Sequence, residues 1–467
     1  MFMGIFCFLY LVAFALIFGR MLYYKGSLKR ERLDNVIMVY VLFLFTFTFS
    51  YFEDTIMIYE NARVFKSALK RGQILHYYDF ALNNSAYGLN ANYNLILYFI
   101  FAVCMLPYDI CCKLFGDIPL LYGHLWYNLI VSVLFVFSGF QLRRLLKVWK
   151  VDEKTLDLMS ILYYMNPVLL FCTVGFSQLD IFFITIFIEG LILFEKGKTD
   201  KACLLWSVSV AMKGFPILVI IPLILLRNKK LLYILRYTLE AMSVTIIFHL
   251  IYGSSEGWIK NQEHSPHYEK LFTSKLPVQV GTISVFIVLY LLILFFCWLY
   301  EKESFRTTIL CGLSVYTAFF CFTGWLPQYA AMMGLFLVLS LLLVEKPHYF
   351  LGIETFFSLG YIFSVWYKYS DVNNTMLLTG ICGMSGYGTK DPVKFRDFIK
   401  GLTDFKYPLE LFLSISTAAA VFLVIYSVWS AKKEKSPKWD FPAGYLYLPL
   451  MPVFAILILS AFINVSG

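Results

Sequence analysis

Charged side chains are scarce in this sequence. Asp, Glu, Lys and Arg make up 15% of its 467 residues, against roughly 25% in ordinary soluble domains. Hydrophobic residues reach 60%, above the roughly 45–50% of such domains. A chain of this composition cannot cover its surface with polar groups, so lipid must form much of its surroundings. The composition therefore excludes a soluble enzyme and a disordered protein.

Cysteines at the short spacing typical of metal-binding pairs are also lacking. The ten cysteines include no Cys-x-x-Cys, and most lie within apolar runs, where cysteine behaves as a small buried side chain. This pattern excludes a disulfide-stapled secreted module and indicates no metal site. The formal charge of +9 does not indicate nucleic-acid binding, because Lys and Arg stand in short clusters between the apolar runs.

Apolar runs long enough to cross a bilayer recur along the chain. About 20 apolar residues span the hydrocarbon core as a helix, and the runs predict an all-α polytopic bundle of about 12–14 transmembrane helices. The predicted spans are 1–19, 36–52, 125–142, 156–174, 181–195, 231–252, 281–300, 307–323, 329–345, 348–367, 409–430 and 444–464, with a short pair at 202–212 and 214–226. The apolar run 94–112 is expected to lie in the membrane plane or to re-enter.

Basic residues predict the direction of these spans. Seven clusters hold 23 of the 39 Lys and Arg: Arg20–Arg32, Arg143–Lys154, Lys196–Lys201, Arg227–Lys230, Lys302–Arg306, Lys346 and Lys432–Lys438. If 94–112 does not cross, all seven lie on one side, which the positive-inside rule identifies as cytoplasmic. The long loops 53–93, 253–280 and 368–408 then share the extracytoplasmic face. Long loops on a rigid bundle often carry function, which predicts one large site open to that side.

The first outer loop begins with Glu53-Asp54 and continues with an amphipathic helical pattern over 54–71. Apolar and basic residues recur at helical spacing on two different sides of this helix: Ile58, Ala62, Phe65 and Leu69 on one, Arg63, Lys66 and Lys70 on the other. The pattern predicts an interfacial helix with its apolar side toward lipid. Asp54 is either a solvated boundary residue or a functional carboxylate. The helix either only anchors the loop or also helps to hold a lipid phosphate beside Asp54.

Tyrosine and asparagine gather in the stretch that follows, residues 72–93. Aromatic rings stack on sugar faces and amides hydrogen-bond hydroxyls, so the stretch suits a carbohydrate. Tyrosine is equally common at membrane interfaces. The stretch alone therefore leaves both interpretations open.

Lys213 stands between two short apolar runs. An ionisable residue at membrane depth costs at least ~2.5–3.5 kcal/mol on insertion scales and normally needs a partner. Lys213 could therefore pair with Asp180, bind a phosphate or reach the membrane surface. Gln178 and Asp180 lie at the lip of the bundle, where they either cap a helix or line a site. The turn Trp325–Tyr329 adds an amide between aromatic rings.

Taken in order, these motifs resemble the GT-C class of integral-membrane glycosyltransferases. The likeness is nearest to the polyprenyl-phosphate-mannose-type mannosyltransferases of GPI-anchor and phosphatidylinositol-mannoside synthesis, and it covers residues 36–345. The resembling elements are Asp54 at the start of a large outer loop, Asn92-Tyr93-Asn94-Leu95, Gly175 with Gln178-Leu179-Asp180, Lys213-Gly214-Phe215-Pro216 followed by Pro222, and Pro327-Gln328-Tyr329. The chain departs from the family pattern at Ser177, where a Gly is usual, and at Asn94, where a Pro is usual.

This resemblance implies inverting transfer of one mannose-like hexose from a polyprenyl-phosphate donor to an acceptor hydroxyl on a lipid or cell-surface glycan. It implies Asp54 as general base and Lys213 and Arg63 as ligands of the donor phosphate. The implied substrate-binding residues are Glu53, Tyr93, Gln178, Asp180, Trp325, Gln328 and Tyr329. No cofactor is required, although some members use a divalent cation. Membrane lipids are expected partners and nucleic acid is not.

The domain prediction divides the chain into a catalytic module, 1–345 with outer loop 53–124, and a C-terminal transmembrane region, 346–467 with outer loop 368–408. Two other classes stay open. A transporter or flippase of lipid-linked sugars would favour inverted repeats, and a polysaccharide polymerase or ligase would favour outer-loop arginines. The expected location is a bacterial plasma membrane, with the ER membrane as the alternative.

Overall fold

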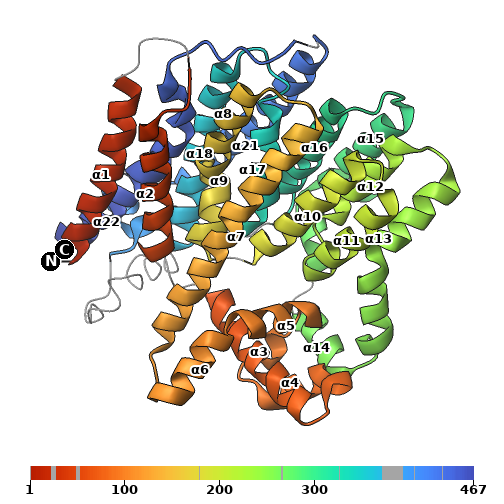
Figure 1. The fold of residues 1–467 in the computed structure, drawn as a ribbon. Coiled ribbons are helices and arrows are strands. Elements are labelled where there is room, and N and C mark those ends of the chain that lie inside the picture. The colour runs from red at the N-terminus through yellow and green to blue at the C-terminus, as the bar shows by residue number, and fades with distance from the viewer. Residues whose placement is uncertain are drawn as a thin grey trace.

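The computed structural model describes residues 2–22, 28–48, 53–177, 179–264, 267–324, 327–370, 393–403, 405–433 and 435–466. Apart from one short hairpin, the regular elements of this described part are helices, which confirms the predicted all-α bundle. Figure 1 shows two groups of helices. The larger group is a bundle of long, roughly parallel helices, and the smaller group lies beneath it. We call the smaller group the cap layer.

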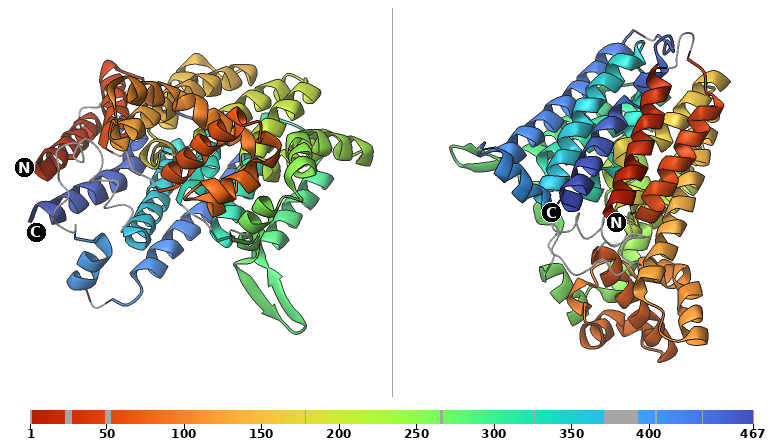
Figure 2. Two further views of the ribbon diagram at one scale, coloured as in Figure 1. Left: turned by 90° about the horizontal axis from the view of Figure 1, so that it is seen from below. Right: turned by 90° about the vertical axis from the view of Figure 1, so that its left-hand side faces the viewer.

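The bundle combines helices from both ends of the chain (Figure 1). Its members are α1 (Phe2–Leu22), α2 (Arg32–Thr48), α7 (Leu120–Val148), α8 (Glu153–Tyr164), α9 (Pro167–Leu170) with η3 (Phe171–Gly175), α10 (Asp180–Glu195), α11 (Thr199–Met212), α12 (Ile217–Arg227), α13 (Leu231–Tyr252), α15 (Val285–Leu299), α16 (Phe305–Phe322), α17 (Ala331–Ser340), α18 (Pro347–Lys368), α21 (Pro408–Ala431) and α22 (Met451–Ser466). The first helix packs against the last one (Figure 2).

Length and apolar composition qualify five of the described helices as membrane spans, or seven if each of two bent pairs counts as one span. The sequence predicted a larger number because several predicted spans fall on apolar helices of only 10–17 residues, among them α12, α15 and α17. Such helices are shorter than the about 20 residues that cross a bilayer without tilt or extension. The chain is a membrane protein with several transmembrane helices.

The cap layer is built from two separate stretches of the chain. Its elements are α3 (Glu53–Lys70), η1 (Ile74–His76), α4 (Tyr77–Asn84), η2 (Gly88–Asn90), α5 (Leu95–Cys104), α6 (Leu106–Phe115) and α14 (Glu256–His264). The apolar run 94–112 forms most of α5 and α6, which meet at an angle of 48°. This pair lies with α3 and α4 beneath the bundle and not among its long helices (Figures 1 and 2).

The predicted amphipathic helix is α3, and its apolar side is covered by protein. Ile58, Ala62 and Phe65 are buried, and α3 packs against α5 and α4. The ring of Phe65 lies 6.0 Å from that of Tyr77. The apolar side is therefore not available to lipid, in contrast to the interfacial placement that the pattern predicted. Only Leu69, near the end of the helix, remains exposed.

A contact between α4 and α14 joins the two stretches of the cap layer. The Asp79 Oδ1 atom accepts a hydrogen bond of 2.7 Å from the Gly257 N–H at the start of α14. A Cβ atom at Gly257 would lie 2.2 Å from the carbonyl oxygen of Tyr78, so only glycine allows this approach. The first and second predicted outer loops thus form one layer.

The basic loops gather at the other end of the bundle. Arg227 is paired with Glu303, and Lys438 Nζ lies 2.7 Å from Glu345 Oε1. The Trp439 indole donates a hydrogen bond of 2.9 Å to the Thr155 hydroxyl. The first contact joins two basic clusters, and the other two bring the chain next to Lys346, Lys432–Lys438 and Arg143–Lys154 together. Which end faces the cytoplasm stays a prediction.

Several shorter elements complete the described structure. They are η4 (His267–Phe272), strands β1 (Lys275–Val278) and β2 (Gly281–Ser284), η5 (Pro327–Ala330), α20 (Phe395–Leu402), η7 (Ala443–Leu446) and η8 (Leu448–Leu450). Most of the outer loop 368–408 lies outside the described residues.

A buried ion pair joins the two N-terminal helices, and a tyrosine of the C-terminal region is hydrogen-bonded to it. Arg20 Nε lies 2.8 Å from Asp34 Oδ1, and both side chains are fully buried. The Tyr447 hydroxyl donates a hydrogen bond of 2.7 Å to the same carboxylate. Removing one partner of a buried pair typically costs about 3–5 kcal/mol, because the other charge remains buried.

We expect Asp34→Asn to lower the unfolding temperature of the detergent-solubilised protein clearly. Glu31→Gln is the control, since its 43% exposed side chain lies 4.0 Å from Arg20; equal unfolding temperatures for the two variants would contradict this role.

Candidate functional site

Lys213 lies at a break between two helices of the bundle. Helix α11 ends at Met212 and α12 begins at Ile217. Lys213 has an extended backbone, with φ −156° and ψ 127°. Pro216 stands immediately before α12, and a proline has no N–H with which to continue the preceding helix. The break turns the chain back on itself and places Lys213 at the turn.

The Lys213 ammonium is paired with the carboxylate of Asp180, the first residue of α10. Its Nζ atom lies 2.8 and 2.9 Å from the two carboxylate oxygens. The Asp180 side chain is 1% exposed and that of Lys213 is 12% exposed. Of the three possibilities for Lys213, the structure therefore shows the pairing. The Lys213 side chain is not completely covered, and it lines the cavity described below.

Tyr329 connects this pair to a second lysine. The Lys213 Nζ atom lies 5.1 Å from the centre of the Tyr329 ring, within the range of cation–π attraction. From η4, Lys270 Nζ donates a hydrogen bond of 3.0 Å to the Tyr329 hydroxyl. Burial lowers the pKa of Lys270, and the charge of Lys213 lowers it further, whereas Asp54 opposes the change. The ammonium groups of Lys213 and Lys270 thus both lie beside the Tyr329 side chain.

Asp54 and Tyr93 belong to the same electrostatic neighbourhood. Asp54 is the second residue of α3 and is partly exposed. Burial raises the pKa of the Tyr93 phenol well above its ordinary value, and the Asp54 carboxylate adds the next largest contribution. The same carboxylate acts on Lys270 and on Tyr329. Asp54 therefore lies within electrostatic range of Tyr93, Tyr329 and Lys270.

A cavity of about 360 Å³ lies between the bundle and the cap layer. Its lining comes from the α11–α12 break, from α13, from the cap layer and from η5: Asn92, Tyr93, Asn94, Val210, Ala211, Met212, Lys213, Gly214, Phe215, Ile217, Met242, Thr245, Phe248, His249, Trp258, Gln262 and Tyr329. Ligand pockets of roughly 300–1,000 Å³ typically combine apolar walls with a few polar groups. We call this cavity the junction cavity.

The polar groups of the junction cavity suit a sugar and an anion together. Asn92, Asn94 and Gln262 bring amides that can hydrogen-bond hydroxyl groups. Tyr93 and Trp258 bring aromatic rings. Lys213 supplies positive charge at the same cavity, and anions are stabilised by such charge in a water-poor site. The arrangement can hold a polar ring with a negatively charged substituent.

The segment 92–94 is held in place by tyrosines of the cap layer. The Tyr78 hydroxyl donates a hydrogen bond of 2.6 Å to the Tyr93 carbonyl, and the Tyr93 N–H donates to the Tyr98 hydroxyl at 3.3 Å. Asn94 caps α5 by accepting from the Ile96 N–H. Of the Tyr- and Asn-rich stretch, the cavity uses only its end. Tyr78 itself is fully buried and has a structural role.

Arg63 does not reach the junction cavity. Its side chain is 57% exposed and lies 3.1 Å from Glu60 Oε1. It lines a different cavity, of about 890 Å³, together with Lys66, Lys70 and Asp109. Nine residues separate Arg63 from Asp54, which is roughly 13 Å along a helix at ~1.5 Å per residue. The expectation that Arg63 and Lys213 share one phosphate is therefore not supported.

Four predicted residues cannot be compared with this arrangement. Gln178 and Trp325 lie outside the described residues, and so do the side chains of Glu53 and Gln328. The backbone of Gln328 belongs to η5, next to Tyr329. Glu53 begins α3, next to Asp54. Their predicted roles in substrate binding stay predictions.

Several cavity residues were not singled out from the sequence. His249, Trp258 and Gln262 come from α13 and α14, and Lys270 of η4, which is not part of the lining, is bonded to the lining residue Tyr329. The second outer loop carried no motif that pointed to them. The only signal was that this loop shares a face with the first one. Among the described residues, no group of three or more His, Cys, Asp or Glu side chains is placed to hold a metal ion.

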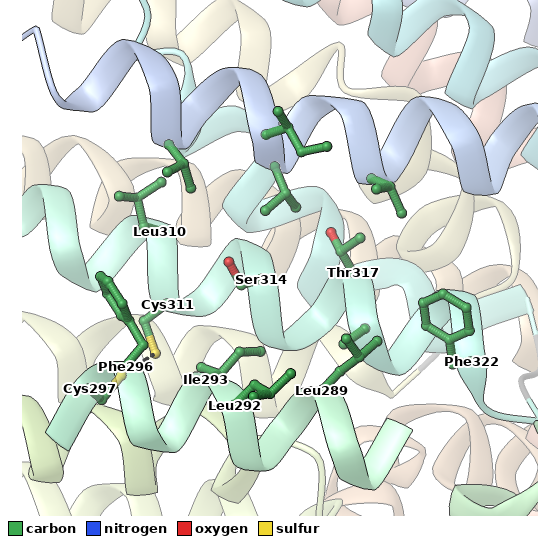
Figure 3. Close-up of a pocket in the computed structure, with 15 residues that line it drawn as sticks. Leu289, Leu292, Ile293, Phe296, Cys297, Leu310, Cys311, Ser314, Thr317 and Phe322 are labelled. Carbon is green, nitrogen blue, oxygen red and sulfur yellow. Dashed lines mark hydrogen bonds between the residues drawn. The ribbon is translucent and has the colours of Figure 1, made fainter. Parts of the chain in front are cut away.

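An apolar groove of about 390 Å³ runs along the bundle between α15, α16 and α21 (Figure 3). Figure 3 shows side chains of these helices, such as Leu292, Phe296 and Phe322, around it. Ala318 lines the groove and also belongs to an apolar cluster with Phe319 and Tyr329. Tyr329 lines the junction cavity. The groove and the junction cavity therefore each include a residue of the same apolar cluster.

No protein-family model, no curated protein and no solved structure matches this chain. Its function is therefore inferred from the residues and geometry of the site.

Proposed function

We propose that this membrane protein is a glycosyltransferase. It transfers one mannose-like hexose from a polyprenyl-phosphate donor to a hydroxyl of a lipid- or glycan-linked acceptor at the extracytoplasmic face. One observation carries the proposal. Tyr93, Lys213 and Tyr329 come from three separate segments and line the junction cavity, Asp180 pairs with Lys213, and the Asp54 carboxylate acts electrostatically on Tyr93 and Tyr329.

The reaction assigned to the cavity is a single displacement. The acceptor hydroxyl attacks the anomeric carbon while Asp54 takes its proton. The bond between that carbon and the phosphate oxygen breaks, and the electron pair leaves with the lipid phosphate. Lys270 and the accessible part of Lys213 stabilise the phosphate as its charge grows. The configuration of the anomeric carbon inverts, because attack and departure take place on opposite faces.

The lipid part of the donor needs apolar surroundings. The groove between α15, α16 and α21 supplies an apolar surface that adjoins the Tyr329 cluster. The basic loops at the other end of the bundle support placing the junction cavity on the extracytoplasmic side. A bacterial plasma membrane is the proposed location, with the ER membrane as the alternative.

A transfer assay with defined lipids tests the proposal. The purified protein in lipid nanodiscs is incubated with a panel of polyprenyl-phosphate monosaccharides and a lipid extract as acceptor. We expect one donor to lose its sugar to an acceptor, with release of the polyprenyl phosphate. If sealed proteoliposomes instead move intact donors between leaflets without sugar release, the protein is a flippase and the proposal is wrong.

Lys270 is expected to be the more important phosphate ligand, because Lys213 is already paired with Asp180. A hydrogen bond to a charged group contributes about 1.5–3 kcal/mol. Lys270→Gln should therefore raise the KM for the donor by about 10–100-fold, at ~1.4 kcal/mol per factor of ten. Steady-state kinetics with the identified donor would measure this. Arg63→Gln is the matched control and should leave the KM unchanged, because Arg63 lines the other cavity.

The pH dependence of donor affinity shows whether the charge of Lys270, and not only its shape, is needed for donor binding. Because the pKa of Lys270 is lowered, the ammonium loses its proton at lower pH than an ordinary lysine does. Donor affinity should fall as the pH rises through that range. Lys270→Arg keeps its charge and should move the fall to higher pH. An unchanged pH profile in Lys270→Arg would show that Lys270 does not bind the phosphate.

A further inference from the structure

One short β-hairpin stands apart from the body of the protein. Strands β1 and β2 pair antiparallel, with Leu276 opposite Ile283 and Val278 opposite Gly281. Figure 2 shows the hairpin projecting sideways, beyond the helices. Isolated two-stranded hairpins are marginally stable in water. This hairpin therefore needs a surface to lie on.

The hairpin has one apolar face. Side chains alternate between the two faces of a strand, and directly opposed residues share a face. Leu276, Val278 and Ile283 therefore lie on one side, where they are 53%, 43% and 41% exposed. Lys275 and Thr282 lie on the other side. Val280 at the turn is 96% exposed. Adjacent exposed apolar side chains of this kind mark an interaction surface.

The position of the hairpin indicates which surface covers it. Strand β2 ends at Ser284 and α15 begins at Val285, so the hairpin leads directly into an apolar helix. The Val285 N–H donates to the Ser274 carbonyl at 3.0 Å, and the Ser284 hydroxyl donates to the Leu271 carbonyl at 2.7 Å. These bonds fix the hairpin relative to α15. It projects from the side of the bundle, in the half nearer the cap layer (Figure 2).

We propose that the hairpin lies on the membrane surface on the side of the cap layer, with Leu276, Val278 and Ile283 against lipid. Between residues 271 and 300 the only charged side chain is Lys275, which lies on the opposite face, toward the headgroups. The hairpin stays at the boundary of the hydrocarbon, because the outer edges of its two strands carry backbone groups that hydrocarbon could not satisfy. This membrane contact is independent of the proposed transferase activity.

Depth-dependent fluorescence quenching tests the contact. An environment-sensitive fluorescent amino acid is introduced at Ile283, and in a matched variant at Thr282, which is adjacent but lies on the other face. Both proteins are reconstituted in vesicles of phosphatidylcholine and phosphatidylglycerol. We expect the probe at 283 to be quenched by spin-labelled lipid and shielded from iodide in water. The probe at 282 should show the reverse.

A third variant carries the probe outside the two strands, so that its signal does not depend on how side chains pack within the hairpin. A probe at Val280, in the exposed turn, should shift its emission to shorter wavelength when the protein moves from a detergent-free polymer into vesicles. Equal iodide quenching at 282 and 283 in vesicles would overturn the proposal. So would shielding at 283 that occurs in native membranes but not in vesicles of the purified protein, since a protein partner would then cover the face.

Discussion

Asp54→Asn is expected to lower the turnover of sugar transfer by about 10²–10⁴-fold, the usual contribution of general-base catalysis. Asparagine keeps the shape of the side chain and can still form hydrogen bonds, but it cannot take the proton of the acceptor. The KM for the donor and the unfolding temperature should change little. Single-turnover measurements with saturating donor would isolate the chemical step.

Glu60→Gln is the matched control for this prediction. Glu60 belongs to the same helix, α3, but it pairs with Arg63 and lines the other cavity, so its loss should leave turnover as in the wild type. Glu53→Gln should also have a small effect. If Asp54→Asn remains as active as Glu60→Gln while Asp180→Asn is inactive, Asp54 is not the base.

Changes at Lys213 and Asp180 should affect stability and activity together. Lys213→Met leaves the buried Asp180 carboxylate without its partner, and Asp180→Asn leaves the ammonium. Breaking a buried pair in this way costs about 3–5 kcal/mol, which should lower the unfolding temperature of both variants. Lys213→Met should also raise the KM for the donor, but by less than Lys270→Gln, because the ammonium that is lost is already paired with Asp180.

The double variant Lys213→Met/Asp180→Asn distinguishes the two roles of the lysine. Removing both charges leaves no unpaired ion, so most of the lost stability should return. Donor use should remain low if Lys213 contacts the phosphate. If activity returns together with stability, Lys213 only supports the structure, and the phosphate is bound by Lys270.

Local features of the sequence predicted the helical elements well. The amphipathic pattern over 54–71 corresponds to α3, Glu53–Lys70, because helical periodicity is set by neighbouring residues. The surroundings of that helix could not be predicted in the same way. Its apolar side looked suited to lipid, yet Ile58 and Phe65 are buried by protein. Periodicity identifies an apolar face but not what covers it.

The candidate site could be predicted where a residue type was unusual for its position. Lys213 stood out because charge is rare between apolar runs, and the suggested pairing with Asp180 is confirmed by contacts of 2.8 and 2.9 Å. Lys270 and Trp258 stood out in no such way. Trp258 reaches the cavity through the packing of α14 on α4, and Lys270 joins the site through its bond to Tyr329, and both are contacts between distant segments.

The close approach of α14 to α4 has a consequence for the evolution of this chain. A side chain at Gly257 would collide with the backbone at Tyr78, so no substitution at Tyr78 can make room for it. Relatives that lose this glycine must therefore move the whole of α14, and with it Trp258 and Gln262 of the cavity wall. Glycine at this position is expected to persist while neighbouring residues drift, and its loss in a lineage would indicate a reshaped junction cavity.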